Sequence, residues 1–288
     1  MISYSNGNFI PTNEVMLPVY DDLVGTIRGY RIFTMGITVN QKLFRLEDHV
    51  QRLITHAQRI YMDIPHTSTE ISQLIVKTIE KNSDESGEFT VLAFYSGGPS
   101  NASKVGPAQQ PRLYILISPD APPPEDWYEN GISLATFPHQ RQYPTVKLFN
   151  YVGGVVAHQT AVQKMNAQEG LFLSPVDNDS ILEGTTFSFF AVDTQGCLIT
   201  HPEDGAILES ITRKVIVELA EKNEIPCKET PLKISKLDSI SEAFLASCNR
   251  GIVPIVKIDD KTIRDGKPGE VTHLISELIN KSQQNYSY

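Results

Sequence analysis

The sequence contains few cysteines and no pattern that would hold a structural metal. Its three cysteines, Cys197, Cys227 and Cys248, lie far apart and form no CxxC pair. An odd number of widely spaced cysteines predicts neither a disulfide framework nor a structural zinc site. This usage is typical of proteins in a reducing compartment, so we expect a cytoplasmic location.

Several other features that assign a function class are also missing. The N-terminal residues lack a basic segment followed by an apolar core, so no signal peptide is predicted. The longest apolar runs, such as residues 113–117, are far too short to cross a membrane. A net charge of -9 argues against binding to nucleic acid, which needs a clustered basic face. No internal repeat, Walker-type phosphate loop or dinucleotide-binding GxGxxG pattern occurs.

The remaining composition is that of an ordinary globular protein, and its length suggests one large or two medium domains. The chain has 288 residues, of which 40% are hydrophobic and 20% charged. Residues 118–125 contain three consecutive prolines, which favour an extended and semi-rigid connection. We therefore predict an N-terminal domain over residues 1–117, a linker over 118–125 and a C-terminal domain over 126–288.

The apolar periodicity predicts both helices and strands. Leu46 to Met62 has apolar residues at helical spacing, and Thr67 with Glu70 forms a capping box that opens a second helix. A further helix is predicted from Val155 to Gln168, with Gly170 as its C-cap, and another after Ser210 as N-cap. Strands are predicted at 89–95, 113–117, 132–137, 170–174 and 187–192.

One lysine lies inside an apolar segment. Lys147 is flanked by Val146, Leu148 and Phe149. Burial among apolar groups penalises the charged form and lowers the pKa of a lysine, which then becomes an amine nucleophile able to form a Schiff base. The alternative is a strand lysine whose ammonium reaches water.

The remaining candidate residues also have simple structural explanations. Glu183 follows two apolar residues, where it either points to water at a strand end or faces a buried cation. The N–H groups of Ile211 and Thr212 would form an anion site at a helix start, although most helix starts bind only water. Ser247 and Cys248 interrupt an apolar strand and either donate to a phosphate or make a turn.

Three arginines lie among apolar residues. Arg28, beside a glycine and aromatic residues, could present its guanidinium to a carboxylate. We expect Arg31 to alternate outward on a half-exposed strand, and Arg52 could simply lie on a solvated helix face.

In their chain order, these residues resemble the motifs of a known family. The set comprises Arg52 in His-Val-Gln-Arg-Leu, Lys147 with Asn150-Tyr151, Glu183, Ile211-Thr212-Arg213 and Ser247-Cys248. It resembles the class IV (fold type IV) pyridoxal-phosphate enzymes from about Asn6 to Leu278. The resemblance implies a mixed α/β fold of two domains, a smaller N-terminal α/β sandwich and a larger C-terminal pseudo-barrel. It also implies a homodimer.

The resemblance further implies a role for each matching residue. Lys147 would form the Schiff base with pyridoxal 5′-phosphate and move the proton. Glu183 would bond the pyridine nitrogen, and Tyr151 the phenolic oxygen. The phosphate would be bound by Arg52, by the N–H groups of Ile211 and Thr212, and by Ser247 and Cys248. The substrate would contact Arg28 and Phe33.

The sequence departs from the family's motifs at several positions. The usual Pro-Gly-Ile-Thr-Arg is here Glu-Ser-Ile-Thr-Arg, and Cys248 stands where a threonine is common. One subgroup has a second carboxylate-binding arginine on the strand over residues 89–95, where this chain has Val91, Leu92 and Ala93.

The resemblance implies an aminotransferase that exchanges an amino group between an amino acid and a 2-oxo acid. Arg28 favours D-amino acids, whereas the apolar strand at 89–94 would suit a branched-chain L-amino acid. Two further activities fit the same motifs: an aminodeoxychorismate lyase, which releases pyruvate, and a cofactor-binding protein without turnover.

Overall fold

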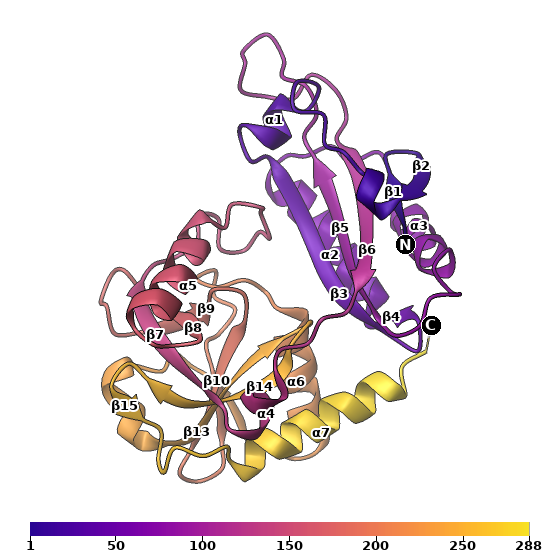
Figure 1. Ribbon diagram of the computed structural model, residues 1–288. Helices are drawn as coiled ribbons and strands as arrows, with labels where there is room; N and C mark the ends of the chain where they lie inside the picture. Colours follow the sequence, from indigo (N-terminus) through magenta and orange to yellow (C-terminus); the bar gives the residue numbers. More distant parts are fainter. Residues whose placement is uncertain (288) are drawn as a thin grey trace. The chain divides into compact units, whose positions relative to one another are not determined.

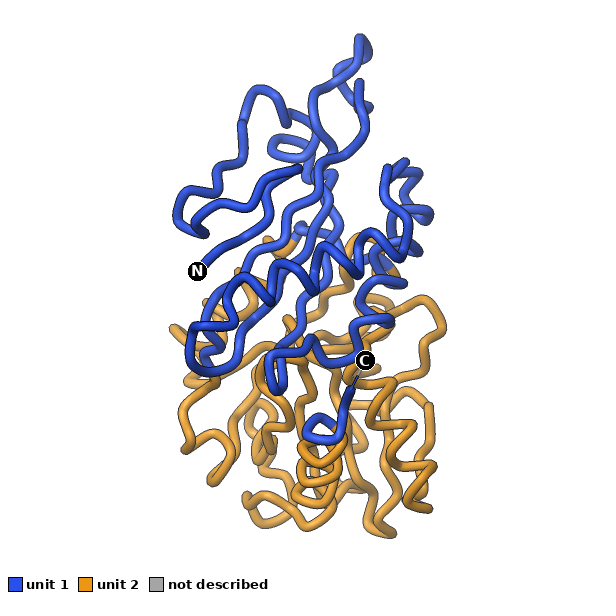
Figure 2. The backbone as a smooth tube through the Cα atoms, turned by 90° about the vertical axis from the view of Figure 1, so that its right-hand side faces the viewer, with its two compact units in different colours: residues 1–121, 146–150, 283–288 blue, residues 122–145, 151–282 orange. Residues whose placement is uncertain are grey.

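The computed structural model describes residues 1–287, which form two compact units (Figures 1 and 2). Unit 1 comprises Met1–Ala121, Val146–Asn150 and the end of the chain from Gln283, and unit 2 comprises Pro122–Thr145 and Tyr151–Ser282. The chain leaves unit 1 after Ala121, within the predicted linker, and returns to it for the segment that contains Lys147. The boundaries at 117 and 126 remain a prediction.

Unit 1 is a six-stranded sheet with two long helices along one face (Figure 1). The strand order is β2-β1-β6-β5-β3-β4, and every neighbouring pair is antiparallel. The elements are β1 Ile2–Ser5, β2 Asn8–Pro11, α1 Leu23–Thr26, β3 Arg31–Val39, β4 Lys42–Leu43, α2 Leu46–Arg59, α3 Ser68–Glu80, β5 Phe89–Ser96 and β6 Arg112–Pro119, with a 3-10 turn at Thr12–Glu14.

The helices of unit 1 agree with the local patterns predicted from the sequence. On α2, Leu46, Val50, Leu53 and Ala57 are buried, which confirms the predicted amphipathic helix. The predicted capping box is also present at α3, where the Thr67 hydroxyl accepts from the N–H of Glu70 and the Glu70 carboxylate accepts from the N–H of Thr67.

Unit 2 is a curled nine-stranded sheet with mixed strand directions (Figure 1). The order is β12-β11-β10-β13-β14-β7-β8-β9, with β15 paired to β14, and β7 runs parallel to both β14 and β8. Its elements are α4 Glu125–Glu129, β7 Ile132–Pro138, α5 Val152–Lys164, β8 Glu169–Leu173, β9 Ile181–Gly184, β10 Ser188–Asp193, β11 Leu198–Thr200, α6 Ile211–Lys222, β12 Cys227–Glu229, β13 Ile240–Ser247, β14 Gly251–Ile258, β15 Lys261–Thr262 and α7 Glu270–Gln284, with a 3-10 turn at Ile234–Ser239.

The predicted C-cap of α5 is wrong. The helix ends at Lys164, before Asn166 adopts a left-handed backbone with φ of 51°. Gly170 lies inside β8, where a Cβ atom would be 3.0 Å from the Thr185 side chain and 3.4 Å from that of Ala157. The glycine therefore serves close packing of α5 and the strand, not helix termination.

No helix in residues 1–287 is both long enough and apolar enough to cross a membrane.

Candidate active site

The main chain of Lys147 is held against unit 1 from two sides. Its carbonyl accepts a hydrogen bond from the N–H of Phe33 on β3, at 3.0 Å, and the next residue, Leu148, forms a β-bridge with Ile32. Its own N–H donates to Nδ1 of His56 on α2, also at 3.0 Å. A short segment from the middle of the chain thus becomes an extra edge of the unit 1 sheet.

The side chain of Lys147 lies on an aromatic surface. Its Nζ is 4.6 Å from the centroid of the Phe33 ring, and that ring packs on Phe149 at 4.8 Å. An ammonium over an aromatic face is attracted by the ring quadrupole. Lys147 and Phe33, both predicted for the site, are therefore in contact.

Two buried histidines of α2 lie near this lysine. Burial lowers the pKa of His56 to about 3, and the positive charges of Arg52, Arg59 and Lys147 add to the effect. Burial likewise lowers the pKa of His49, with Arg52 the next cause. His56 is therefore neutral and can accept the hydrogen bond from the N–H of Lys147.

In unit 2, a buried arginine connects Glu183 and Tyr151. Arg141 donates from Nη2 to Glu183 Oε2 at 2.8 Å and from Nη1 to the Tyr151 hydroxyl oxygen at 3.0 Å. Glu183 is 6% exposed, so the buried cation that would distinguish it from a strand-end acid is present. Sequence reasoning missed Arg141 because it lies in a loop without periodic pattern, and only its partners reveal its position.

Glu183 can accept a further hydrogen bond beside the one from Arg141. A guanidinium can only donate, so the Tyr151 hydroxyl acts as acceptor toward Arg141. Within residues 1–287, Glu183 Oε1 accepts no hydrogen bond. Glu183 therefore offers one further carboxylate oxygen.

The start of α6 has the predicted cap. The Ser210 hydroxyl accepts from the N–H of Arg213 at 3.3 Å. The N–H groups of Ile211 and Thr212 are in the first turn, where a helix provides no acceptor. Two backbone donors thus point out of the positive end of the helix.

Ser247 and Cys248 end β13 and begin the turn to β14, so the predicted turn is present. Arg250 donates from Nε to Ser247 Oγ at 3.2 Å and from Nη1 to Glu169 Oε1 at 2.6 Å. The sequence did not single out Arg250 or Glu169, because their pairing depends on the register of distant strands.

The remaining predicted arginines lie in unit 1. Arg52 is half-buried on α2. Arg28 is exposed, and its Nη2 lies 3.4 Å from the Lys104 carbonyl oxygen. The outward orientation predicted for Arg31 is wrong: its side chain is 12% exposed and pairs at 2.6 Å with the buried Asp22 carboxylate.

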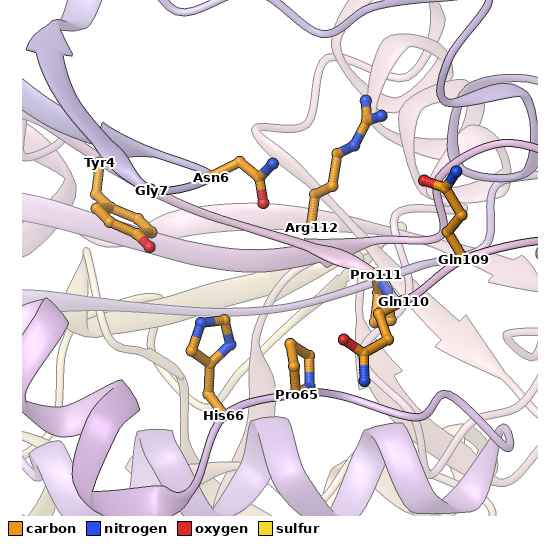
Figure 3. Close-up of a pocket in the computed structure, with 9 residues that line it drawn as sticks. All are labelled: Tyr4, Asn6, Gly7, Pro65, His66, Gln109, Gln110, Pro111 and Arg112. Atoms are coloured by element: carbon orange, nitrogen blue, oxygen red, sulfur yellow. The ribbon is translucent and has the colours of Figure 1, made fainter.

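A separate pocket of about 700 Å³ opens on unit 1 (Figure 3). It is bordered by the β1–β2 turn, the residues before α3 and the start of β6, and none of the predicted site residues lines it. His66 Nδ1 there lies 2.9 Å from the hydroxyl of the buried Tyr95.

Known proteins resemble this chain in both sequence and fold. The profile of amino-transferase class IV matches residues 31–258. A D-alanine aminotransferase of Staphylococcus haemolyticus is 31% identical over 279 residues, which is 96% of each chain. The crystal structure of an Escherichia coli branched-chain amino acid aminotransferase superposes with a TM-score of 0.88, at 22% identity, over 97% of this chain and 93% of that one.

A branched-chain aminotransferase from the thermophilic archaeon Thermoproteus uzoniensis, solved with norvaline, has a TM-score of 0.85 at 23% identity, over 99% of this chain and 96% of that one. These structures confirm the predicted mixed α/β fold of type IV. The chain belongs to the class IV aminotransferases, enzymes that use pyridoxal 5′-phosphate as cofactor.

Proposed function

We propose that this aminotransferase acts on D-amino acids and that the predicted site residues bind cofactor and substrate. The observation that carries the proposal is the two-sided restraint of the Lys147 main chain by Phe33 and His56. A reactive amine gains from such restraint, because orientation is fixed before the reaction. The name of the Staphylococcus haemolyticus relative and the presence of Arg28 favour D-amino acids.

The available groups match the cofactor's polar ends. Glu183 Oε1 would accept from the protonated pyridine nitrogen, while its Oε2 accepts from Arg141. Tyr151 would donate to the phenolic oxygen. The phosphate would bind to Arg52, to the N–H groups of Ile211 and Thr212, and to Ser247 and Cys248, which together supply one cation and several donors.

When bound, the cofactor supplies an electron sink for the substrate carbon. Lys147 Nζ would form the covalent link to it and then move a proton at the substrate carbon. The neutral ring of His56 holds the lysine main chain without adding a positive charge beside the amine. Arg28 and Phe33 would contact the substrate.

A branched-chain L-amino acid remains the second candidate. The E. coli structure with TM-score 0.88 is named for that activity, and β5 offers apolar residues over much of its length. Aminodeoxychorismate lyase would use the same lysine but release pyruvate without an amino acceptor.

We also propose a homodimer in the cytoplasm. The α5 helix exposes Val152, Val155, Val156 and Val162, an apolar face that a second subunit could cover. All three cysteines are free, which fits a reducing compartment.

The visible spectrum of the purified protein, titrated with D-alanine, D-glutamate and L-leucine, tests this function. We expect the absorption band of the bound cofactor to shift with a D-amino acid and not with L-leucine. A response to L-leucine alone would favour the branched-chain activity, and pyruvate release without an acceptor would favour the lyase.

The Lys147→Ala variant tests the role of the lysine. Because it lacks the amine, we expect loss of both turnover and the band of the covalently bound cofactor. Turnover retained in this variant would overturn the assignment of Lys147.

A further inference from the structure

Arg250 lies in the turn between β13 and β14, and its side chain is almost entirely buried. The side chain is 10% exposed, and its guanidinium lies 5.5 Å from the centroid of the Phe187 ring. The main chain is held as well, because the Tyr128 hydroxyl of α4 donates to the Arg250 carbonyl oxygen at 2.9 Å. The guanidinium therefore extends from a fixed point of the turn.

The guanidinium of Arg250 contacts three segments of unit 2. Its Nε donates to Ser247 Oγ at 3.2 Å, within the same turn. Its Nη1 donates to Glu169 Oε1 on β8 at 2.6 Å. Its Nη2 donates to Thr186 Oγ1, in the turn between β9 and β10, also at 2.6 Å. Because the donors of a guanidinium have fixed directions, these bonds hold the Ser247 turn and the Thr186 turn at one separation.

Glu169 forms a second connection between the same two turns. The residue is 6% exposed. Its Oε1 accepts from Arg250, while its Oε2 accepts from the Thr185 hydroxyl at 2.7 Å. Removing one partner of a buried ion pair leaves the other charge without compensation, so we expect both residues to be needed for this connection.

Each of the two turns adjoins a group that is proposed to bind one end of the cofactor. Thr185 and Thr186 follow closely after Glu183, which is assigned to the pyridine nitrogen. Ser247 is assigned to the phosphate. The pyridine ring between these two ends is rigid, so both ends can be bound at once only when the two turns lie at the right separation.

We propose that Arg250, held by Glu169, is a positioning residue that sets the separation between the Glu183 side and the Ser247 side of the cofactor site. The inference rests on the proposed function, because that function assigns Glu183 and Ser247 to opposite ends of pyridoxal 5′-phosphate. A ligand bound at both ends loses affinity when the two sites shift relative to each other, whereas a ligand bound at one end does not depend on their separation.

The test compares pyridoxal 5′-phosphate with pyridoxal, which has the same ring and aldehyde but no phosphate. Both compounds are titrated into the full-length protein freed of cofactor, as wild type and as Arg250→Met, with protein fluorescence as the readout. Methionine fills similar space but cannot donate a hydrogen bond. We expect Arg250→Met to bind pyridoxal 5′-phosphate about 10- to 100-fold more weakly than the wild type, and pyridoxal with unchanged affinity.

Two further variants separate positioning from general stability. Glu169→Gln keeps the shape of the side chain and removes its charge, so it should also weaken binding of pyridoxal 5′-phosphate selectively, by less than Arg250→Met. Glu242→Gln is the matched control, because Glu242 is another buried carboxylate of unit 2, which accepts from the N–H of Thr272 in α7 at 2.8 Å. It should lower the free energy of unfolding in urea and leave both affinities unchanged.

An equal loss of affinity for both compounds in Arg250→Met would overturn the inference, because the variant would then disturb the site as a whole. Unchanged affinity for pyridoxal 5′-phosphate would overturn it as well. If Arg250→Met does not fold, the same comparison with Glu169→Gln decides. A wild-type protein that binds neither compound would contradict the proposed cofactor site and the inference together. A cofactor band that responds only to L-leucine would contradict the preference for D-amino acids alone, and the two affinities would still decide on Arg250.

Discussion

At the scale of single residues, the Lys147 peptide depends on two partners from different elements. Phe33 on β3 donates to its carbonyl, and His56 on α2 accepts from its N–H. Since His56 is 2% exposed, no water can readily replace it as acceptor. The position of the reactive lysine is therefore coupled to the packing of α2.

His56→Leu should destabilise the protein by about 1–3 kcal/mol, because the N–H of Lys147 would be left buried without an acceptor. His56→Asn should recover much of this loss, since its Oδ1 can reach a position similar to Nδ1. The free energy of unfolding in urea measures both effects. Equal stability of the two variants would show that the hydrogen bond contributes nothing.

At the scale of elements, α2 combines an apolar face with two buried histidines. His49 and His56 are seven residues apart and so lie on the same side of the helix. Both are neutral in the fold, because burial lowers the pKa of each. In the unfolded chain the same residues titrate near the ordinary histidine value.

Stability should therefore fall on acidification. With a folded pKa of about 3 for His56 against an ordinary 6.5, the unfolded chain binds more protons as the pH falls below 6.5. Each histidine then reduces the free energy of unfolding by up to about 1.4 kcal/mol per pH unit. Urea unfolding at pH 7, 6 and 5 measures the slope, and His56→Asn should reduce it. A slope that His56→Asn leaves unchanged would contradict this account.

The helices α3 and α6 each begin with a side-chain N-cap, so the effects of removing the two caps can be compared. Thr67→Ala and Ser210→Ala each remove a side-chain acceptor at a helix start and should each cost about 1 kcal/mol of stability. Only Ser210→Ala should also weaken binding of pyridoxal 5′-phosphate, because only the start of α6 is proposed to hold the phosphate. Fluorescence titration of the apoprotein checks this. Equal cofactor affinities in both variants would count against the phosphate site.

At the scale of the whole molecule, the proposed dimer depends on the exposed valines of α5. Val156 is 60% exposed on this face. The Val156→Glu variant should have a lower molar mass in light scattering, shifted from that of a dimer toward that of a monomer. Burying an unpaired carboxylate in an apolar interface is costly. Val176→Glu is the control, because Val176 is 91% exposed outside any helix or strand and should leave the mass unchanged. A wild-type protein that is already monomeric would contradict the dimer.

Local patterns in the sequence were sufficient for part of this molecule. The helix spacing of α2, the capping box of α3 and the Ser210 cap of α6 all involve residues within a few positions of one another, so local chemistry determined them. The chain order of Arg52, Lys147, Glu183 and Thr212 was likewise enough to indicate the family, which the class IV profile then matched.

Only the tertiary structure decided which charges meet. Arg31 is buried because Asp22 lies beside it, Arg141 reaches Glu183 across 42 positions, and Gly170 packs against Thr185 and Ala157. Arg31, Ser96 and Arg112 are neighbours only because of the register of β3, β5 and β6. Such contacts join residues far apart in the chain, and a pattern of neighbouring side chains contains no information on strand register or loop path.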